Sequence, residues 1–198
     1  MSILVVGSVA FDSIETPFGE VDEVLGGSAT YFSTSASFFT DVNLVAVVGE
    51  DFPDEHREML AGRGVDLSGL QTSPGQTFRW KGRYGFDLNE AHTLDTQLNV
   101  FESFSPELPE SYRNAEYVFL ANIDPELQLE VLQQVEAPKL IACDTMNFWI
   151  EGRERRWSRP WPTSMSSLSM KGKRGNWPIN RTCVRRPSRF WRWGRSRW

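Results

Sequence analysis

The sequence predicts an α/β fold with a mainly parallel sheet, a small β-sheet lid and a C-terminal tail that we expect to be disordered. Three observations support this. Apolar runs of strand length alternate with helix-like segments up to residue 151, and residues 75–104 instead alternate polar with aromatic or apolar side chains. Residues 152–198 hold 14 of the 21 basic residues, one of the 26 acidic residues and six of the eight tryptophans. The length of 198 residues fits one domain followed by this tail.

The first elements read as strand, helix, strand and helix. "SILVVGSVAFDSI" is an apolar run broken by Gly7, and its continuous apolar character predicts a strand buried on both faces. "GGSATYFSTSASFF" predicts a helix that begins beside a glycine turn. "VNLVAVVGEDF" predicts a second buried strand that ends at Gly49. "PDEHREMLAGRGV" predicts a helix, because Pro53 suits its first turn and Gly62 and Gly64 end it.

The later elements continue the alternation. "AEYVFLANI" and "KLIACDT" predict two more buried strands. Between them, "DPELQLEVLQQV" predicts a helix with Asp124 as its N-cap and Pro125 at its first position. Strand–helix alternation of this kind indicates a layered α/β fold.

The lid is predicted from two segments. Residues 75–104 contain Gly82 and Gly85 and predict antiparallel strands, and residues of about 12–25 are expected to add to the same small sheet. A small sheet above a parallel α/β core fits a lid over a ligand site.

Polar residues at strand ends are the candidate site residues. Asp12 follows the first strand, where open parallel sheets bind ligands, although a turn or capping role is about as frequent. Gly26 and Gly27 would let a ligand approach the backbone, although a simple turn before a helix is the commoner use of such a pair. Asp144 and Asn147 lie past a strand end and have the same two interpretations. The sequence contains no Walker-type loop, G-x-G-x-x-G motif, zinc spacing or nucleophile elbow.

The cysteines indicate the compartment. Cys143 and Cys183 have no metal or redox spacing, and the sequence has no signal peptide, so we expect a cytoplasmic protein. The opening "ILVV" is too short to span a membrane, so no membrane partner is predicted.

Four segments resemble, in order and spacing, the N-terminal part of the ribokinase-like (phosphofructokinase-B) carbohydrate kinases. They are "ILVVGSVAFDS", "VLGGSATYFS", "LVAVVGEDFP" and the following "GV". The resemblance covers about residues 1–151, and the lid and "DTMNFW" fall where that family has its lid and its D-x-N strand end. It implies a partial three-layer αβα core and an ATP-dependent kinase that phosphorylates a hydroxyl of a sugar or nucleoside, with ATP and Mg as cofactors of the full-length family.

The resemblance also implies roles for individual residues. Asp12 would hydrogen-bond substrate hydroxyls, and the Gly-Gly turn would lie at the substrate site and lid hinge. The substrate-binding residues expected from the resemblance are Asp12, Gly26, Gly27, Ser28, Asn122 and Asn147. Tyr31 stands where the family often has a substrate-contacting Asn, which leaves the identity of the sugar open. Some members of the family form homodimers through the lid, and this chain has the same option.

In the family, phosphoryl transfer needs later parts: an Asn-x-x-Glu motif for magnesium, a Gly-Ala-Gly-Asp turn with the catalytic base, and further strands that hold ATP. We expect none of these later parts to be present in this chain. Phosphoryl transfer depends mainly on positioning and charge neutralisation. We therefore assign no catalytic and no metal-binding residue, and expect this chain to bind ATP and Mg poorly and to be inactive as written.

The tail reads as an out-of-frame translation. In the frame that joins the third base of one codon to the next two, Trp161-Pro162 must give Ala, Met170-Lys171 must give Glu and Asn176-Trp177 must give Leu. With permitted bases elsewhere, this frame allows a buried strand "VDVLVIN" whose last residue opens the motif "NEGE", the next stretch expected of such a kinase. The hypothesis is a one-base insertion or deletion, or a sequencing error, near codons 150–156.

Two non-catalytic alternatives stay open. One is a sugar-binding remnant. The other is a tail selected for nucleic-acid binding, with Arg neutralising phosphates and Trp stacking on bases, and we rank this partner below a small-molecule substrate. An amphipathic membrane helix is disfavoured by four prolines, Pro160, Pro162, Pro178 and Pro187.

Overall fold

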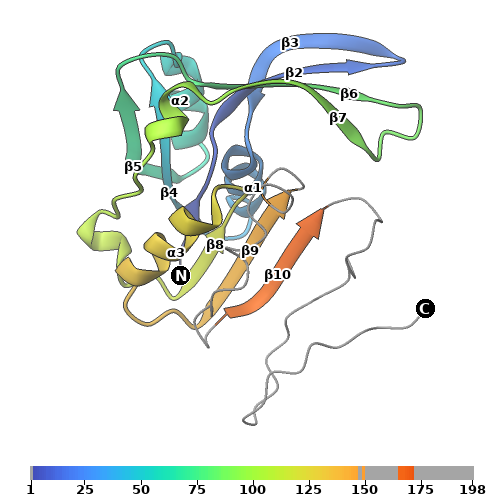
Figure 1. Cartoon of the computed structure of the whole chain (residues 1–198). Coiled ribbons are helices and arrows are strands. Elements are labelled where there is room, and N and C mark those ends of the chain that lie inside the picture. The colour runs from blue at the N-terminus through green and yellow to red at the C-terminus, as the bar shows by residue number, and fades with distance from the viewer. Residues whose placement is uncertain (1, 147–148, 150–164, 172–198) are drawn as a thin grey trace, which may run out of the picture.

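The computed structural model describes residues 2–146, residue 149 and the backbone of residues 165–171. Its main sheet has six strands in the order β10-β9-β8-β1-β4-β5, and every neighbouring pair is parallel (Figure 1). The strands of this core sheet are β1 (Ser2–Val6), β4 (Asp41–Gly49), β5 (Val65–Ser73), β8 (Tyr117–Leu120), β9 (Leu140–Met146) and β10 (Met165–Lys171). The predicted α/β class with a mainly parallel sheet is confirmed.

The core sheet is buried on both faces, as the apolar runs predict. In β1, Leu4 and Val6 belong to one apolar cluster and Val5 to the other, and all three are fully buried. Helices α1 (Ser28–Ala36) and α2 (Asp54–Ala61) pack on the Val5 side. Helix α3 (Pro125–Gln134) and the 3₁₀ helices η1 (Asn99–Ser103) and η2 (Glu110–Tyr112) pack on the other side. The result is a three-layer αβα core.

Helix starts follow the sequence signals. Asp124 Oδ1 accepts a hydrogen bond of 2.9 Å from the Glu126 N–H, and Pro125 occupies the first turn of α3. Pro53 takes an extended conformation immediately before α2, which ends at Gly62. The Asp124 side chain thereby satisfies a backbone N–H that the start of α3 leaves unpaired, whereas Pro53 makes no side-chain capping bond.

A second sheet of four strands projects from the core (Figure 1). Its order is β3-β2-β6-β7, and its strands are β2 (Ala10–Thr16), β3 (Gly19–Gly26), β6 (Phe78–Tyr84) and β7 (Ala91–Gln97). The predicted lid segments therefore do form one small sheet. The structure corrects two details: β2 and β6 run parallel, and Asn99–Ser103 form η1 where a strand was expected.

Two further strands were not predicted. Strand β5 was missed because few of its residues are buried, and Gly69 lies where a side chain would meet Val45 and the Tyr112 ring. Strand β10 (Met165–Lys171) pairs with β9 and lies within the C-terminal tail. The remaining residues of the tail lie outside the described residues. No helix in the described part of the chain is long and apolar enough to cross a membrane.

Candidate substrate site

Asp12 and Gly26 form the centre of the site. Asp12 lies near the start of β2, two pairs away from the Ala10–Gly26 pair that joins β2 to the end of β3. A Cβ atom added to Gly26 would overlap the Asp12 carboxylate. The Gly27 N–H donates a hydrogen bond to this carboxylate. Gly26 is therefore glycine because the aspartate side chain occupies the space of its missing Cβ.

Gly27 shapes the turn into α1. Its φ of 93° lies in the region that favours glycine, and a Cβ there would lie 2.9 Å from the Ala10 nitrogen. Beyond it, the Ser28 N–H donates to Ser8 Oγ (3.1 Å) and the Ala29 N–H donates to the Ser8 carbonyl (3.0 Å). The N-terminus of α1 is thus fixed to the segment that follows β1, and Asp12, Gly26, Gly27 and Ser28 come together.

Burial changes the titration of Asp12. It raises the pKa of the carboxyl to about 6, and the hydrogen bond from Gly27 opposes the shift. Asp12 is therefore largely ionised at pH 7. Burial also raises the pKa values of Tyr31 and Tyr84, and the negative charge of Asp12 raises both further. The two phenols thus lie within electrostatic reach of the same carboxylate.

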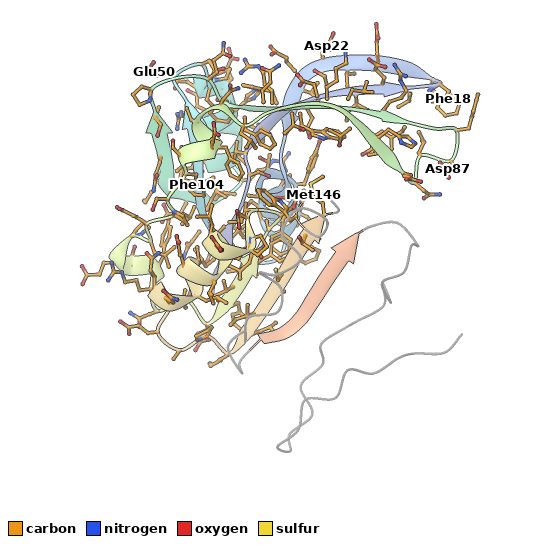
Figure 2. The ribbon with its side chains drawn as sticks, viewed as in Figure 1. Phe18, Asp22, Glu50, Asp87, Phe104 and Met146 are labelled. Carbon is orange, nitrogen blue, oxygen red and sulfur yellow. The ribbon has the colours of Figure 1, made fainter. Side chains whose placement is uncertain are left out.

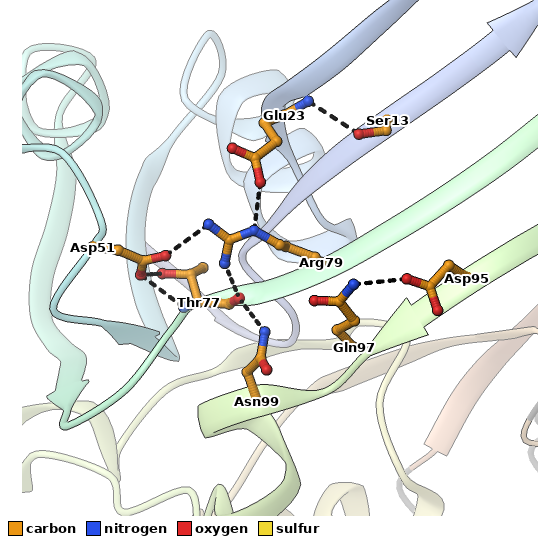
Figure 3. A network of polar contacts seen from close by, with 8 residues as sticks. All are labelled: Ser13, Glu23, Asp51, Thr77, Arg79, Asp95, Gln97 and Asn99. Atoms are coloured by element: carbon orange, nitrogen blue, oxygen red, sulfur yellow. Dashed lines mark hydrogen bonds and ion pairs between the residues drawn. The ribbon is translucent and has the colours of Figure 1, made fainter.

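A polar network fixes the lid to the core (Figure 3). Thr77 is fully buried: its N–H and its hydroxyl both donate to Asp51 Oδ1 at 2.7 Å, and its hydroxyl accepts from the Gly49 N–H at 3.0 Å. Arg79 then binds Asp51 Oδ2 (2.9 Å) and Glu23 Oε1 (2.5 Å). We call Glu23, Asp51, Thr77 and Arg79 the lid anchor. It joins the turn after β4 to β6 and, through Arg79, to β3.

The lid anchor also sets charge states. Burial of Asp51 works against ionisation, but hydrogen bonds from Thr77 and Arg79 outweigh it and lower the pKa of Asp51. Hydrogen bonds from Arg79 to Glu23 and Asp51 raise the pKa of Arg79, against the effect of burial. Asp51 and Arg79 therefore both keep their charges at neutral pH.

The lid anchor was not predicted from the sequence. Its residues are up to 56 positions apart, and ion pairs between distant segments leave no local pattern. The one available signal was the polar "GED" at the end of an apolar strand.

Comparison with known proteins relates this geometry to a family. The chain is 29% identical over 144 residues to a cytidine kinase of Thermococcus kodakarensis, a match that covers 71% of this chain and 50% of that protein. It superimposes on a ribokinase from Cryptococcus neoformans var. grubii in complex with ADP with a TM-score of 0.65 and 19% identity, over 84% of this chain and 57% of that one. This is the ribokinase fold.

A second solved structure agrees. A nucleoside kinase of Methanocaldococcus jannaschii, an archaeal member of the ribokinase family, gives a TM-score of 0.57 at 14% identity, over 85% of this chain and 69% of that one. No protein-family model matches the sequence. The chain spans about half the length of the curated relative it matches. The resemblance to ribokinase-like kinases drawn from the sequence is thereby confirmed.

Asn122 stands apart from the Asp12 group in its contacts. It comes two residues after the end of β8, directly after Ala121. Gly7 packs against Ala121 so closely that a Cβ on Gly7 would overlap the Ala121 methyl group. Its Oδ1 is buried and has no hydrogen-bond partner among the described residues. A buried oxygen of this kind is costly to leave unpaired, so it suits a ligand donor. Asn147 lies outside the described residues.

Gln128 on α3 supports the strand ends near the site, and the sequence did not predict this role. It is fully buried, and its Nε2 donates to the Ala121 carbonyl (2.8 Å) and the Asp144 carbonyl (3.0 Å). It thereby ties the carboxyl ends of β8 and β9 together. A glutamine on the otherwise apolar face of "PELQLEVL" was the available signal.

The structure also bears on magnesium binding. The spacing Asn-x-x-Glu occurs at Asn99–Glu102, but there it lies in η1, and the Asn99 side chain donates to the Thr77 carbonyl at 3.0 Å. No group of three or more His, Cys, Asp or Glu side chains suited to a metal ion is found in the described part of the chain.

Proposed function

We propose that this chain is the substrate-binding part of an ATP-dependent kinase that transfers a phosphoryl group to a hydroxyl of a sugar or nucleoside. The observation that carries the proposal is the half-buried Asp12 carboxylate, held by the Gly26–Gly27 turn at the N-terminus of α1 in a ribokinase fold. The similar proteins support it, because they are named as a cytidine kinase, a ribokinase and a nucleoside kinase.

Asp12 would act by holding the acceptor. An ionised carboxylate accepts hydrogen bonds from two neighbouring hydroxyls, and such charge-assisted bonds are about twice as strong as neutral ones. Ser28 follows the turn directly, with its Oγ 3.1 Å from Ser8 Oγ, and the buried Asn122 Oδ1 is a further acceptor. These residues bind and orient; none of them is assigned as the base.

The test is a calorimetric titration of the full chain with ribose, fructose, cytidine and adenosine. We expect binding by the wild type and loss of most of the affinity in Asp12→Asn. Asp87→Asn is the matched control, because Asp87 lies at the far tip of the lid beside Phe18 (Figure 2). Equal binding by wild type and Asp12→Asn would overturn the proposed role.

The chain as written is proposed to be inactive. In this class ATP and Mg²⁺ supply the phosphoryl group and neutralise its charge. The segments that would hold them are not found downstream of residue 151. A coupled assay with ATP, Mg²⁺ and the sugar panel should therefore give no turnover above the blank, and measurable phosphorylation would contradict this.

The tail is proposed to result from a shift of reading frame near codons 150–156. With permitted bases at its unforced positions, the alternative frame allows a strand "VDVLVIN" across codons 163–170, and its last residue opens an Asn-x-x-Glu motif, as expected of the next stretch of such a kinase. Resequencing from about codon 140 tests it. One continuous frame that reaches a Gly-Ala-Gly-Asp motif is expected, and downstream DNA without kinase coding in any frame would refute the shift.

Nucleic-acid binding by the tail is the second candidate, favoured by its 14 basic residues and six tryptophans. It predicts RNA or DNA binding at low salt that weakens steeply as salt rises. Absence of binding at low salt would remove this candidate.

Association through the lid is a further proposal. Every residue of β7 is exposed, and Phe18 and Phe86 are 71% and 80% exposed where their rings meet edge to face. Light scattering after size exclusion should report twice the monomer mass, and Phe86→Ser should shift it to the monomer.

A further inference from the structure

The two faces of the lid differ in chemistry. Residues paired across neighbouring strands share a face. One face carries the ion pairs of Glu15 with Lys81 (3.1 Å) and Arg83 (2.6 Å), together with Arg79 and Glu23 of the lid anchor. The other face carries Asp12, which pairs with Val24 on β3 and Trp80 on β6. We call the second one the Asp12 face.

The Asp12 face is mainly apolar and aromatic. Its strand positions are Asp12, Ile14 and Thr16 on β2, Val21 and Val24 on β3, Trp80, Gly82 and Tyr84 on β6, and Thr93 and Thr96 on β7. Asp12 is the carboxylate among these positions. The other polar side chains at these positions are three threonines and the Tyr84 phenol, and Thr93 already accepts a hydrogen bond from Trp80. Aromatic rings and aliphatic groups therefore make up most of the face.

Trp80 is held in one orientation on this face. A Cβ added to Gly82 would overlap its six-membered ring, so the indole lies over the glycine, two residues further along β6. Its Nε1–H donates to Thr93 Oγ1 at 3.2 Å, which fixes the ring toward β7. The side chain is only partly buried. A flat indole with a fixed edge and a partly open surface is pre-organised for stacking.

Two tyrosines complete the aromatic group near Asp12. Tyr84 lies on the same face four residues after Trp80, and Tyr31 comes from α1, one turn from the Gly26–Gly27 turn. The negative charge of Asp12 acts on both phenols, and Tyr84 also acts on Tyr31. Tyr31 is 56% exposed, so its ring is accessible to a ligand.

We propose that Trp80, Tyr84 and Tyr31 are specificity-determining residues that bind a planar nucleobase, so that the acceptor is a nucleoside whose ribose hydroxyls are bound by Asp12. This inference rests on the proposed function, because it names the substrate class of the same site. Aromatic rings stack on any of the nucleobases, and one such ring contributes roughly 1–3 kcal/mol of binding free energy per base. The Asp12 face supplies the rings, and Asp12 supplies the acceptor for the sugar.

The test is calorimetric titration of the full chain with cytidine, adenosine and ribose at pH 7.5. The wild type should bind at least one nucleoside about tenfold more tightly than ribose. Trp80→Leu keeps apolar volume but removes the aromatic ring, and should abolish that preference while leaving ribose binding within about twofold. Phe39→Leu is the matched control, because it removes an aromatic ring that is 86% exposed outside the lid and should leave the binding of all three ligands unchanged.

Each outcome decides a different point. Ribose binding as tight as nucleoside binding, or full nucleoside preference in Trp80→Leu, overturns the aromatic site but leaves the kinase proposal standing. Failure of the wild type to bind any of the ligands overturns the proposed function and this inference with it. If Trp80→Leu does not fold, Tyr84→Leu and the ligand ranking of the wild type still decide.

Discussion

The core sheet and the lid sheet are stabilised in different ways. In the core, β1 and β4 are buried on both faces, and Leu4, Val5 and Leu44 are fully excluded from solvent. In the lid, one face is held by ion pairs of partly exposed side chains, and β7 is exposed along its whole length. The hydrophobic effect therefore dominates in the core, while the lid depends on weaker polar contacts. The lid is therefore the less stable of the two sheets, although it carries Asp12, and a bound ligand can increase its order.

Truncation in the core should have the largest effect. Leu120→Ala removes a fully buried side chain at the end of β8 and should lower the free energy of unfolding by about 3–4 kcal/mol. Leu94→Ala on β7 is the control; its side chain is 45% exposed, and we expect less than about 0.5 kcal/mol. Urea unfolding measures both. Similar losses would show that the lid is packed as tightly as the core.

Asp12→Asn should stabilise the chain at neutral pH. The pKa of Asp12 is about 6 in the folded chain and 3.8 as its ordinary value, so the folded state disfavours the ionised form. The resulting penalty is absent below pH 3.8, grows as pH rises, and is complete above pH 6, where it amounts to about 3 kcal/mol. Thermal melts of wild type and variant should therefore diverge between pH 4 and pH 7. Parallel melts across this range would contradict the buried carboxylate.

Arg79→Gln should loosen the lid and leave the core intact. It removes the ion pairs to Asp51 and Glu23 and the stacking of the guanidinium 5.4 Å above the Phe11 ring. Since these side chains are partly exposed, we expect a loss of about 1–2 kcal/mol. Hydrogen exchange should speed up in β2 and β6 while β1 and β4 keep their protection. Uniformly faster exchange would show that the two sheets unfold as one unit.

Arg83→Gln should have the smallest effect. Arg83 binds Glu15 at 2.6 Å, but its side chain is 61% exposed and Lys81 remains beside the same carboxylate. We expect a change of about 0–0.5 kcal/mol in the free energy of unfolding, further reduced by salt. A loss as large as that of Arg79→Gln would mean that the whole charged face, and not the lid anchor, holds the lid.

The sequence predicted what local patterns encode. The strands β1, β4, β8 and β9 were recognised because burial on both faces requires continuous apolar runs, and α3 because Asp124 and Pro125 mark its start. Strand β5 escaped because its sequence, with Gly69 in the middle, lacks such a run. The parallel pairing of β2 with β6 was missed because residues 10–15 and 78–83 meet only in the folded chain.

The candidate site shows the same division. Asp12 was predicted as a site residue from its position after an apolar run, and its link to the Gly26–Gly27 turn was predicted from the resemblance to the ribokinase-like kinases. The contacts that support the site, from Arg79 and Gln128, join distant segments, and their only local signals were the polar "GED" and the glutamine in "PELQLEVL". The role of Asn147 and the cytoplasmic location stay predictions.

The most direct test of the central claim is the pH dependence of ligand binding through Asp12. Calorimetric titration of cytidine and ribose from pH 5 to pH 8 should show affinity that rises through about pH 6 and levels above about pH 7, because the ionised carboxylate accepts the substrate hydroxyls. Asp12→Asn should bind weakly and without this pH dependence, while Asp87→Asn follows the wild type. A flat profile in the wild type, or undiminished binding by Asp12→Asn, would contradict the assignment of Asp12 as the substrate-binding carboxylate.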